Sequence, residues 1–164
     1  MLRQFASLIL LAGFAAAPAI AQNASEIANV RDGKSCPGCN LFQAELSYRD
    51  AKTINLSGAR LRQSNLALTT YDDANLSGAN LSVSNLFGAR FNRTNFSHAN
   101  LQNAIAVGTY FGSSDLAGAD LSGANFSGAD LSLAKGLTQA QLNRACGDAN
   151  TKLPKGRTIP KCAR

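Results

Sequence analysis

The sequence is poor in the residues on which catalysis and metal binding usually depend. Among its 164 residues there is one histidine, His98, and there are four cysteines. A glycine-rich phosphate loop and a histidine–carboxylate cluster are both absent, so nucleotide chemistry and a metal centre have no support in the sequence. His98 stands alone, as is typical of an ordinary surface histidine. We therefore predict no catalytic residue, no cofactor and no metal, and a protein that is not an enzyme.

The middle of the chain also lacks the periods of helices and strands. From residue 39 to residue 133, Leu or Phe recurs every fifth position, which fits neither 3.6 nor 2 residues per repeat. We call the recurring position the centre of its pentapeptide. The centres from Leu41 to Leu131 define 19 consecutive pentapeptides, and 16 of the centres are Leu or Phe. The residue two places before the centre is Ala, Ser, Thr or Cys in 17 of the 19, with Arg49 and Ile54 as exceptions. This pattern predicts a stacked repeat that buries the same two positions in every unit.

The wording of the repeats, Ala-Asn-Leu-Ser-Gly at 74–78 and close variants at 119–123 and 124–128, resembles the pentapeptide-repeat family. The resemblance implies an all-β fold, a right-handed quadrilateral β-helix in which four pentapeptides make one coil, with nearly five coils over residues 36–134. In this fold, each centre and the small residue two places before it face the axis, and the other three residues of the pentapeptide face water.

Stacking the chain at 20 residues per coil predicts which side chains lie above one another. Leu61, Leu81, Leu101 and Leu121 should form one inner column. In another column, Tyr71, Phe91 and Phe111 should form one offset aromatic stack, with space beside Tyr71 left by the small Ala51. We interpret these aromatic residues as core.

Residues 1–21 are typical of an export signal. Arg3 supplies the charge, residues 5–17 the apolar stretch, and Ala19 and Ala21 the small-residue cleavage site before Gln22. The apolar stretch is shorter than a membrane-spanning helix requires. We expect a periplasmic or secreted protein that begins with a lead-in segment, 22–35; an uncleaved membrane anchor is the alternative.

The four cysteines are placed as two pairs that flank the repeats, which suggests an oxidising compartment. A disulfide needs Cα atoms within about 7 Å, so partners at opposite ends of the rod are excluded. That leaves Cys36 with Cys39 and Cys146 with Cys162. The Cys-x-x-Cys spacing of the first pair also occurs in thiol–disulfide enzymes and zinc sites, which is the enzymatic alternative. A structural bridge is favoured, because Cys39 occupies an inward position of the first repeat.

Beyond the repeats, residues 135–164 change in character. Thr138 and Gln141 predict a capping box and a short helix over 138–146, ended by Gly147 and covering the carboxyl end. An irregular tail tied back by Cys162 should follow. This segment has seven basic residues against Asp148 alone, whereas residues 36–134 have six basic and seven acidic residues. Binding to phosphates of the cell envelope or of nucleic acid through this tail is one hypothesis, and a solvated tail is the other.

The resemblance brings one further hypothesis, because the best-characterised family members imitate DNA and inhibit type II topoisomerases as acidic, dimeric, cytoplasmic rods. The near-neutral rod and the export signal disfavour that role here. No residue is transferred from those proteins.

One side of the expected rod carries apolar residues at outward positions. These residues are Tyr48, Leu68, Phe87, Ile105 and Val107. A contiguous strip of this kind often marks an interface, although coverage by residues 22–35 or chance would also explain it. We predict an exported, non-enzymatic scaffold for protein interaction or structural support. Its partner is another protein or a second copy, or an anionic envelope component, with no small-molecule substrate and DNA unlikely.

Overall fold

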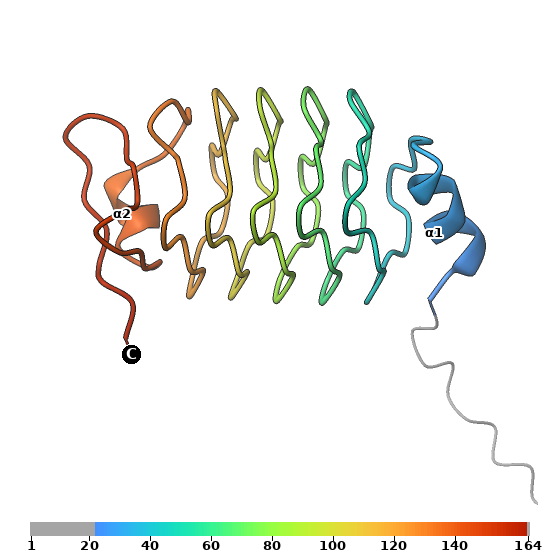
Figure 1. Ribbon diagram of the computed structural model, residues 1–164, viewed down its shortest axis with the longest axis horizontal. Coiled ribbons are helices and arrows are strands. Elements are labelled where there is room, and N and C mark those ends of the chain that lie inside the picture. The colour runs from blue at the N-terminus through green and yellow to red at the C-terminus, as the bar shows by residue number, and fades with distance from the viewer. Residues whose placement is uncertain (1–21, 164) are drawn as a thin grey trace, which may run out of the picture.

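The computed structural model describes residues 22–163. Figure 1 shows a rod of stacked turns, with α1 (Ala24–Arg31) at the amino end and α2 (Gln139–Leu142) at the carboxyl end. The expected export signal, 1–21, lies outside the described residues. No helix between residues 22 and 163 has the length and apolar character needed to span a membrane.

The turns pair through single-residue parallel bridges in place of extended strands. From Asn40 with Arg60 to Asp115 with Lys135, every bridge joins residues 20 positions apart. Four pentapeptides fill 20 residues, so each pentapeptide lies next to the equivalent one of the following turn. Extended strands do not form because the residue two places after every centre but the last, Leu131, turns the backbone with a positive φ, which is 64° at Gly78. Glycine adopts this conformation at little steric cost, which explains the Gly in Ala-Asn-Leu-Ser-Gly.

The core is the row of pentapeptide centres along the axis of the rod. All 19 centres are buried, and Leu61, Leu81, Leu101 and Leu121 have no exposed surface. Phe91 and Phe111 stack at 5.8 Å between ring centroids and 27° between planes, as expected. Tyr71 instead meets Phe91 edge-on, at 6.4 Å and 74°, so the prediction of one offset stack is wrong at Tyr71.

The aromatic core also extends across neighbouring sides of the rod. Phe96, from the next side, meets the edge of Phe91 at 5.0 Å and 85°. Stacking the sequence in columns could not reveal this contact, because it joins two different columns. Edge-to-face contacts of this kind suit the quadrupoles of aromatic rings.

The polar positions of the repeat satisfy the backbone. Around Leu76, the Leu76 amide donates to Asn95 O at 2.7 Å, and the Asn75 amide donates to Ile54 O at 2.9 Å. The Ser77 amide finds its acceptor in the side chain of Asn75, at 3.0 Å. Asn or Asp before the centre is therefore a local acceptor for the amide two residues on, which accounts for its recurrence.

Helix α1 closes the amino end and was not predicted. Its N-cap is Asn23, whose side chain accepts from the Glu26 amide at 3.3 Å, and Glu26 in turn accepts from the Asn40 amide at 2.7 Å. Ile27 and Val30 are buried. The three-residue spacing of Asn23 and Glu26 is a helix-start signal that the sequence analysis left unused.

Helix α2 is shorter than the sequence suggested. The capping box of Thr138 and Gln141 is present, but the helix ends at Leu142, so its prediction over 138–146 is wrong. Cys146 donates its amide to Ala124 O at 3.0 Å and forms a parallel bridge with Asn125. Because this pairing takes up the Cys146 backbone, the chain leaves the helix before reaching it.

Candidate functional surfaces

The first cysteine pair belongs to the start of the rod. Cys36 and Cys39 form a disulfide with 5.5 Å between Cα atoms. Cys39 is buried and Cys36 is half-buried. The Cys36 amide donates to Asn55 O at 2.8 Å, which extends the pairing of the first turn. Across residues 22–163 every cysteine is in a disulfide, and no group of three or more His, Cys, Asp or Glu residues could hold a metal ion.

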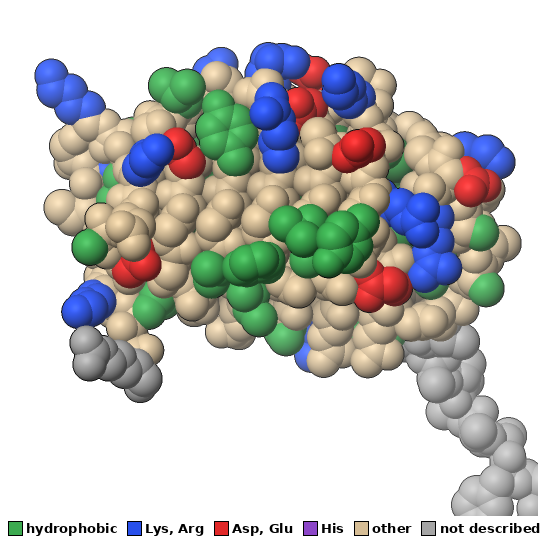
Figure 2. Space-filling model, viewed as in Figure 1, with side chains coloured by type: hydrophobic (Ala, Val, Ile, Leu, Met, Phe, Trp, Pro, Cys, Tyr) green, Lys and Arg blue, Asp and Glu red, His purple; other side chains and the backbone are tan. Residues whose placement is uncertain are grey.

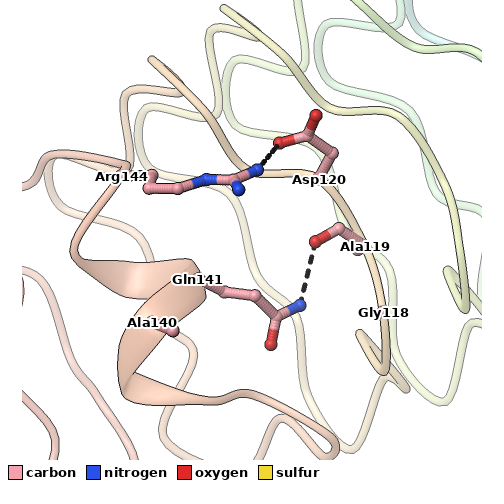
Figure 3. Close-up of a pocket in the computed structure, with 6 residues that line it drawn as sticks. All are labelled: Gly118, Ala119, Asp120, Ala140, Gln141 and Arg144. Carbon is pink, nitrogen blue, oxygen red and sulfur yellow. Dashed lines mark hydrogen bonds and ion pairs between the residues drawn. The ribbon is translucent and has the colours of Figure 1, made fainter.

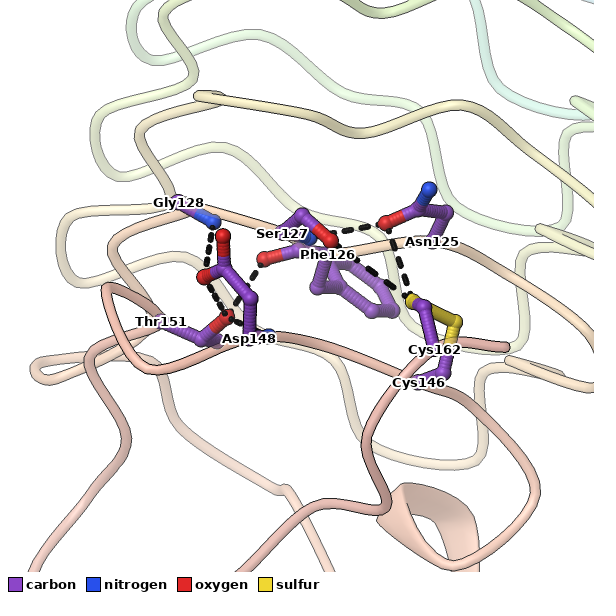
Figure 4. The surroundings of a disulfide bond; sticks show 8 residues. All are labelled: Asn125, Phe126, Ser127, Gly128, Cys146, Asp148, Thr151 and Cys162. Carbon is purple, nitrogen blue, oxygen red and sulfur yellow. Dashed lines mark hydrogen bonds between the residues drawn. A yellow bond between two sulfur atoms is a disulfide. The ribbon is translucent and has the colours of Figure 1, made fainter. Parts of the chain in front are cut away.

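The second disulfide, between Cys146 and Cys162, lies against the last turn (Figure 4). Asp148 accepts a hydrogen bond from the Gly128 amide at 2.8 Å, and this bond is the main reason why its pKa is lowered. Thr151 donates its hydroxyl to Phe126 O at 2.9 Å. The tail therefore continues the hydrogen bonding of the rod before the disulfide fastens its end.

Part of the basic charge of the tail is already neutralised. Arg144 forms an ion pair with Asp120, and Lys152 Nζ lies 3.4 Å from Asp130 Oδ2. The pKa of Asp120 is lowered, first by the hydroxyl of Ser122 and further by hydrogen bonds that include the one from Arg144. Pairing reduces the charge that these two cations could offer to a phosphate-bearing partner.

A cavity of about 320 Å³ lies between α2 and the turn at 118–120 (Figure 3). Its lining consists of Gly118, Ala119, Asp120, Ala140, Gln141 and Arg144. Gln141 Nε2 donates to Ala119 O and to Leu116 O, each at 2.9 Å. Gln141 and Arg144 both bond to the turn on the opposite side of the cavity. These contacts attach α2 to the rod, so we interpret the cavity as a space left by the packing of α2 on the last turns.

One side of the rod carries paired charges of both signs. Arg90 Nε lies 3.0 Å from Asp72 Oδ2, and the Arg90 guanidinium lies 5.6 Å from the ring centroid of Tyr110. On the same side, Arg93 Nε lies 2.6 Å from Asp73 Oδ1. This two-point pairing with Arg93 lowers the pKa of Asp73, the hydrogen bond being the larger cause. These pairs leave little net charge on this side.

The side adjacent to these paired charges, around the centres Leu46, Leu66, Leu86 and Ala106, carries an apolar strip. The strip is defined as Tyr48, Leu68, Phe87, Ile105 and Val107. The exposed fractions are 76% for Tyr48, 42% for Leu68, 49% for Phe87 and 48% for Ile105. Val107 is half-buried. Helix α1 binds the first turn through Arg31 Nε and Glu45 O at 2.9 Å, yet it leaves Tyr48 uncovered. Residues 22–35 therefore do not account for the strip.

Charged residues on the side of the apolar strip are confined to its first turn, where Glu45 and Arg49 flank Tyr48. Residues 63–69, 83–89 and 103–109, which form this side in three successive turns, include no Asp, Glu, Lys or Arg. Val83, 43% exposed, lies at the border of the same side and was missed by the sequence analysis. Figure 2 shows hydrophobic side chains in a row along one face of the rod, with charged side chains gathered at its upper edge and toward its ends.

Comparisons with known proteins point to one family. A family model described as pentapeptide repeats matches the chain in 8 copies, over residues 54–93, 72–103 and 94–132. Among solved structures, a trypsin-treated form of QnrB1, a plasmid-mediated fluoroquinolone resistance protein, is 19% identical with a TM-score of 0.47, covering 78% of this chain and 81% of that one. Among curated proteins no match is found.

Two further solved structures come from photosynthetic organisms. Rfr23 from the cyanobacterium Cyanothece 51142 is 24% identical with a TM-score of 0.34, covering 79% of this chain and 97% of that one. A pentapeptide repeat protein from the thylakoid lumen of Arabidopsis thaliana is 19% identical with a TM-score of 0.34, covering 77% of this chain and 62% of that one. At these TM-scores the likenesses support no statement about function.

Proposed function

This chain belongs to the pentapeptide-repeat family, and we propose that it is an exported, non-enzymatic scaffold that binds another protein through the apolar strip. In this proposal the turns form a right-handed quadrilateral β-helix and α2 caps its carboxyl end. Removal of residues 1–21 releases the protein into the periplasm or the medium.

The observation that carries the proposal is the contrast between two sides of the rod. On one side, Arg90 and Arg93 have carboxylate partners within the chain. On the other, Tyr48, Leu68 and Phe87 are exposed to water at positions where the repeat most often has Gly or Ser. An exposed apolar patch with charged residues only at one end has the composition of a protein interface, with an apolar centre and a polar rim.

The alternative roles have weaker support. A thiol–disulfide enzyme needs an accessible, reactive thiol, whereas Cys39 is buried and bound to Cys36. A phosphate-binding tail has two of its cations engaged, Arg144 with Asp120 and Lys152 with Asp130. A DNA mimic needs a strongly anionic surface, and residues 36–134 have six basic against seven acidic residues.

Affinity capture from an envelope extract tests the proposal. The wild-type protein, Leu68→Asp and Phe87→Asp serve as baits, with Ser77→Asp, half a turn away from the strip, as the matched control. Each strip variant should lose its specific partner, because a buried carboxylate without a counter-ion opposes association, while the control retains it. Retention of the same partners by both strip variants contradicts the proposal. N-terminal sequencing of the exported chain tests cleavage before Gln22.

A further inference from the structure

We propose that the partner of the apolar strip is a second copy of this chain, bound face to face with the two rods antiparallel. This inference rests on the proposed function, since it names the partner of the same surface. In a two-fold arrangement of this kind, the axis lies between the second and third turns and runs across the rod. The first turn of one copy then meets the fourth turn of the other, and equivalent positions of the repeat face each other.

The strip is partly complementary to itself in this orientation, because Tyr48, Phe87 and Val107 each face a smaller residue. Two places after the centre, the four turns carry Tyr48, Leu68, Gly88 and Gly108 in order. Tyr48 of one copy therefore faces Gly108 of the other. A Cβ added at Gly108 would have no atom within 4 Å, so there is open space at that position for the tyrosine ring. The Leu68 side chain already lies over Gly88 of its own chain, 2.7 Å from an added Cβ, so the two copies of Leu68 meet near the axis.

The position directly after the centre shows the same alternation. The four turns carry Ser47, Ala67, Phe87 and Val107 at this position. The two-fold arrangement pairs Phe87 with Ala67 of the second copy, and Val107 with Ser47. Parallel rods would oppose each turn to itself and would bring Tyr48 against Glu45 of the same turn. Antiparallel rods place Glu45 opposite Ile105, at the border of the strip, and leave Tyr48 opposite a glycine. Shape therefore favours the antiparallel arrangement.

Charge permits this contact between identical surfaces. A surface that meets its own copy meets its own charges, so a net charge on it would repel. Residues 63–69, 83–89 and 103–109 have none, and the first turn has one charge of each sign, Glu45 and Arg49, so this side has no net charge. The excess of basic residues lies in 135–164, beyond the strip. Glu45 is at the rim, and its carboxylate accepts from the Ser47 amide at 3.0 Å.

The exposed area of the strip limits how much surface the dimer can bury. Aromatic side chains bury roughly 150–250 Å² each when fully covered. With four large side chains about half exposed, each copy contributes on the order of 400 Å², which gives about 800 Å² in total, in the range of weak and transient associations. We therefore expect a dimer that forms reversibly and becomes populated only as the protein concentration rises.

Sedimentation velocity over a concentration series tests the dimer. The wild-type mass should rise from monomer toward dimer as concentration increases. Ala67→Asp places a carboxylate without a counter-ion against Phe87 of the second copy and should weaken the dimer at least tenfold, while Ser77→Asp, half a turn away, should leave it unchanged. A monomer at all concentrations, or a dimer equally stable in Ala67→Asp, overturns the proposal. So does association that is lost on removing residues 1–21, because the apolar stretch at 5–17 would then be its cause.

Cysteine crosslinking under mild oxidation tests the orientation. Ser47→Cys and Val107→Cys are prepared separately, with the native disulfides intact. An equal mixture should give a crosslinked dimer, and Ser47→Cys alone should give none. Efficient crosslinking of Ser47→Cys with itself would overturn the antiparallel arrangement.

The two proposals fail in different ways. A chain that stays monomeric but loses a captured protein on Leu68→Asp refutes the dimer and retains the proposed scaffold. A dimer that depends on Ala67, with no other protein captured through the strip, supports self-association as the task of this surface.

Discussion

The buried hydroxyl of Tyr71 gives a stability prediction whose sign follows directly from the structure. The Tyr71 side chain has no exposed surface, and its hydroxyl has no hydrogen-bond partner. One turn earlier in the same column lies Ala51, and the small inward position before it is occupied by Arg49, whose side chain is exposed. The charge of Arg49 acts on the phenol, but no group of that turn forms a hydrogen bond with the hydroxyl. An unpaired buried hydroxyl costs about 1–3 kcal/mol.

Tyr71→Phe removes the unpaired hydroxyl and keeps the ring that meets Phe91. We expect the free energy of unfolding at pH 7 to rise by about 1–2 kcal/mol, measured by chemical denaturation. Tyr48→Phe is the matched control, because Tyr48 is 76% exposed and its hydroxyl is solvated. The control should change the free energy of unfolding by less than about 0.5 kcal/mol.

The pH dependence gives a second measurement of the same group. Burial raises the pKa of Tyr71 to about 12, the nearby Arg49 charge opposing this shift. Between the unfolded value near 10 and the folded value, the unfolded chain has released the phenol proton and the folded chain still holds it. The tyrosine contribution is thus fully present below about pH 10 and is lost as pH rises, by up to about 2–3 kcal/mol at pH 12. The advantage of Tyr71→Phe over wild type should widen across this range.

The outcome that refutes this reasoning is equally specific. A Tyr71→Phe protein less stable than wild type at pH 7 would show that the hydroxyl has a partner whose hydrogen bond outweighs its burial. A stability difference that stays constant from pH 9 to pH 12 would show that the phenol ionises equally in both states.

Three further predictions concern the repeat and its ends. Asn75→Ala removes the acceptor of the amide two residues on and should lower the free energy of unfolding by about 1 kcal/mol; an unchanged urea midpoint would contradict this role. Val83→Gly relieves a β-branched residue held at φ 58° and should raise the urea midpoint, by about 1 kcal/mol in free energy, whereas a lower midpoint would refute the strain. Replacing Cys146 and Cys162 by Ser opens a disulfide between residues 16 apart and should cost about 3 kcal/mol in a thermal melt; an unshifted melting temperature would count against it.

The sequence predicted the core because the period of five is a property of each local unit. Leu61, Leu81, Leu101 and Leu121 are buried for the same reason, so one rule covers them all. The edge-on contact of Tyr71 with Phe91 escaped prediction because ring orientation depends on neighbours from other columns, such as Phe96. The register of the repeat determines which residues face the axis, whereas the rotamers of these residues depend on packing against their neighbours.

The ends of the rod were harder to predict because they do not repeat. The capping box of Thr138 was visible in the sequence, but the end of α2 depends on the pairing of Cys146 with the last turn, which is a tertiary contact. Helix α1 had a visible start signal in Asn23 and Glu26, and it is stabilised by burial of Ile27 on the first turn. The apolar strip was predictable because a constant 20-residue turn brings residues far apart in the sequence onto one side.

Residue-resolved carbene footprinting tests most directly the claim that a 20-residue turn builds an apolar contact surface. At low protein concentration, Leu68 and Phe87 should be labelled while their buried neighbours Leu66 and Leu86 are not. At high concentration, labelling of Leu68 and Phe87 should fall. Comparable labelling of Leu86 and Phe87 would contradict the turn, and labelling of Phe87 that is independent of concentration would contradict the contact between copies.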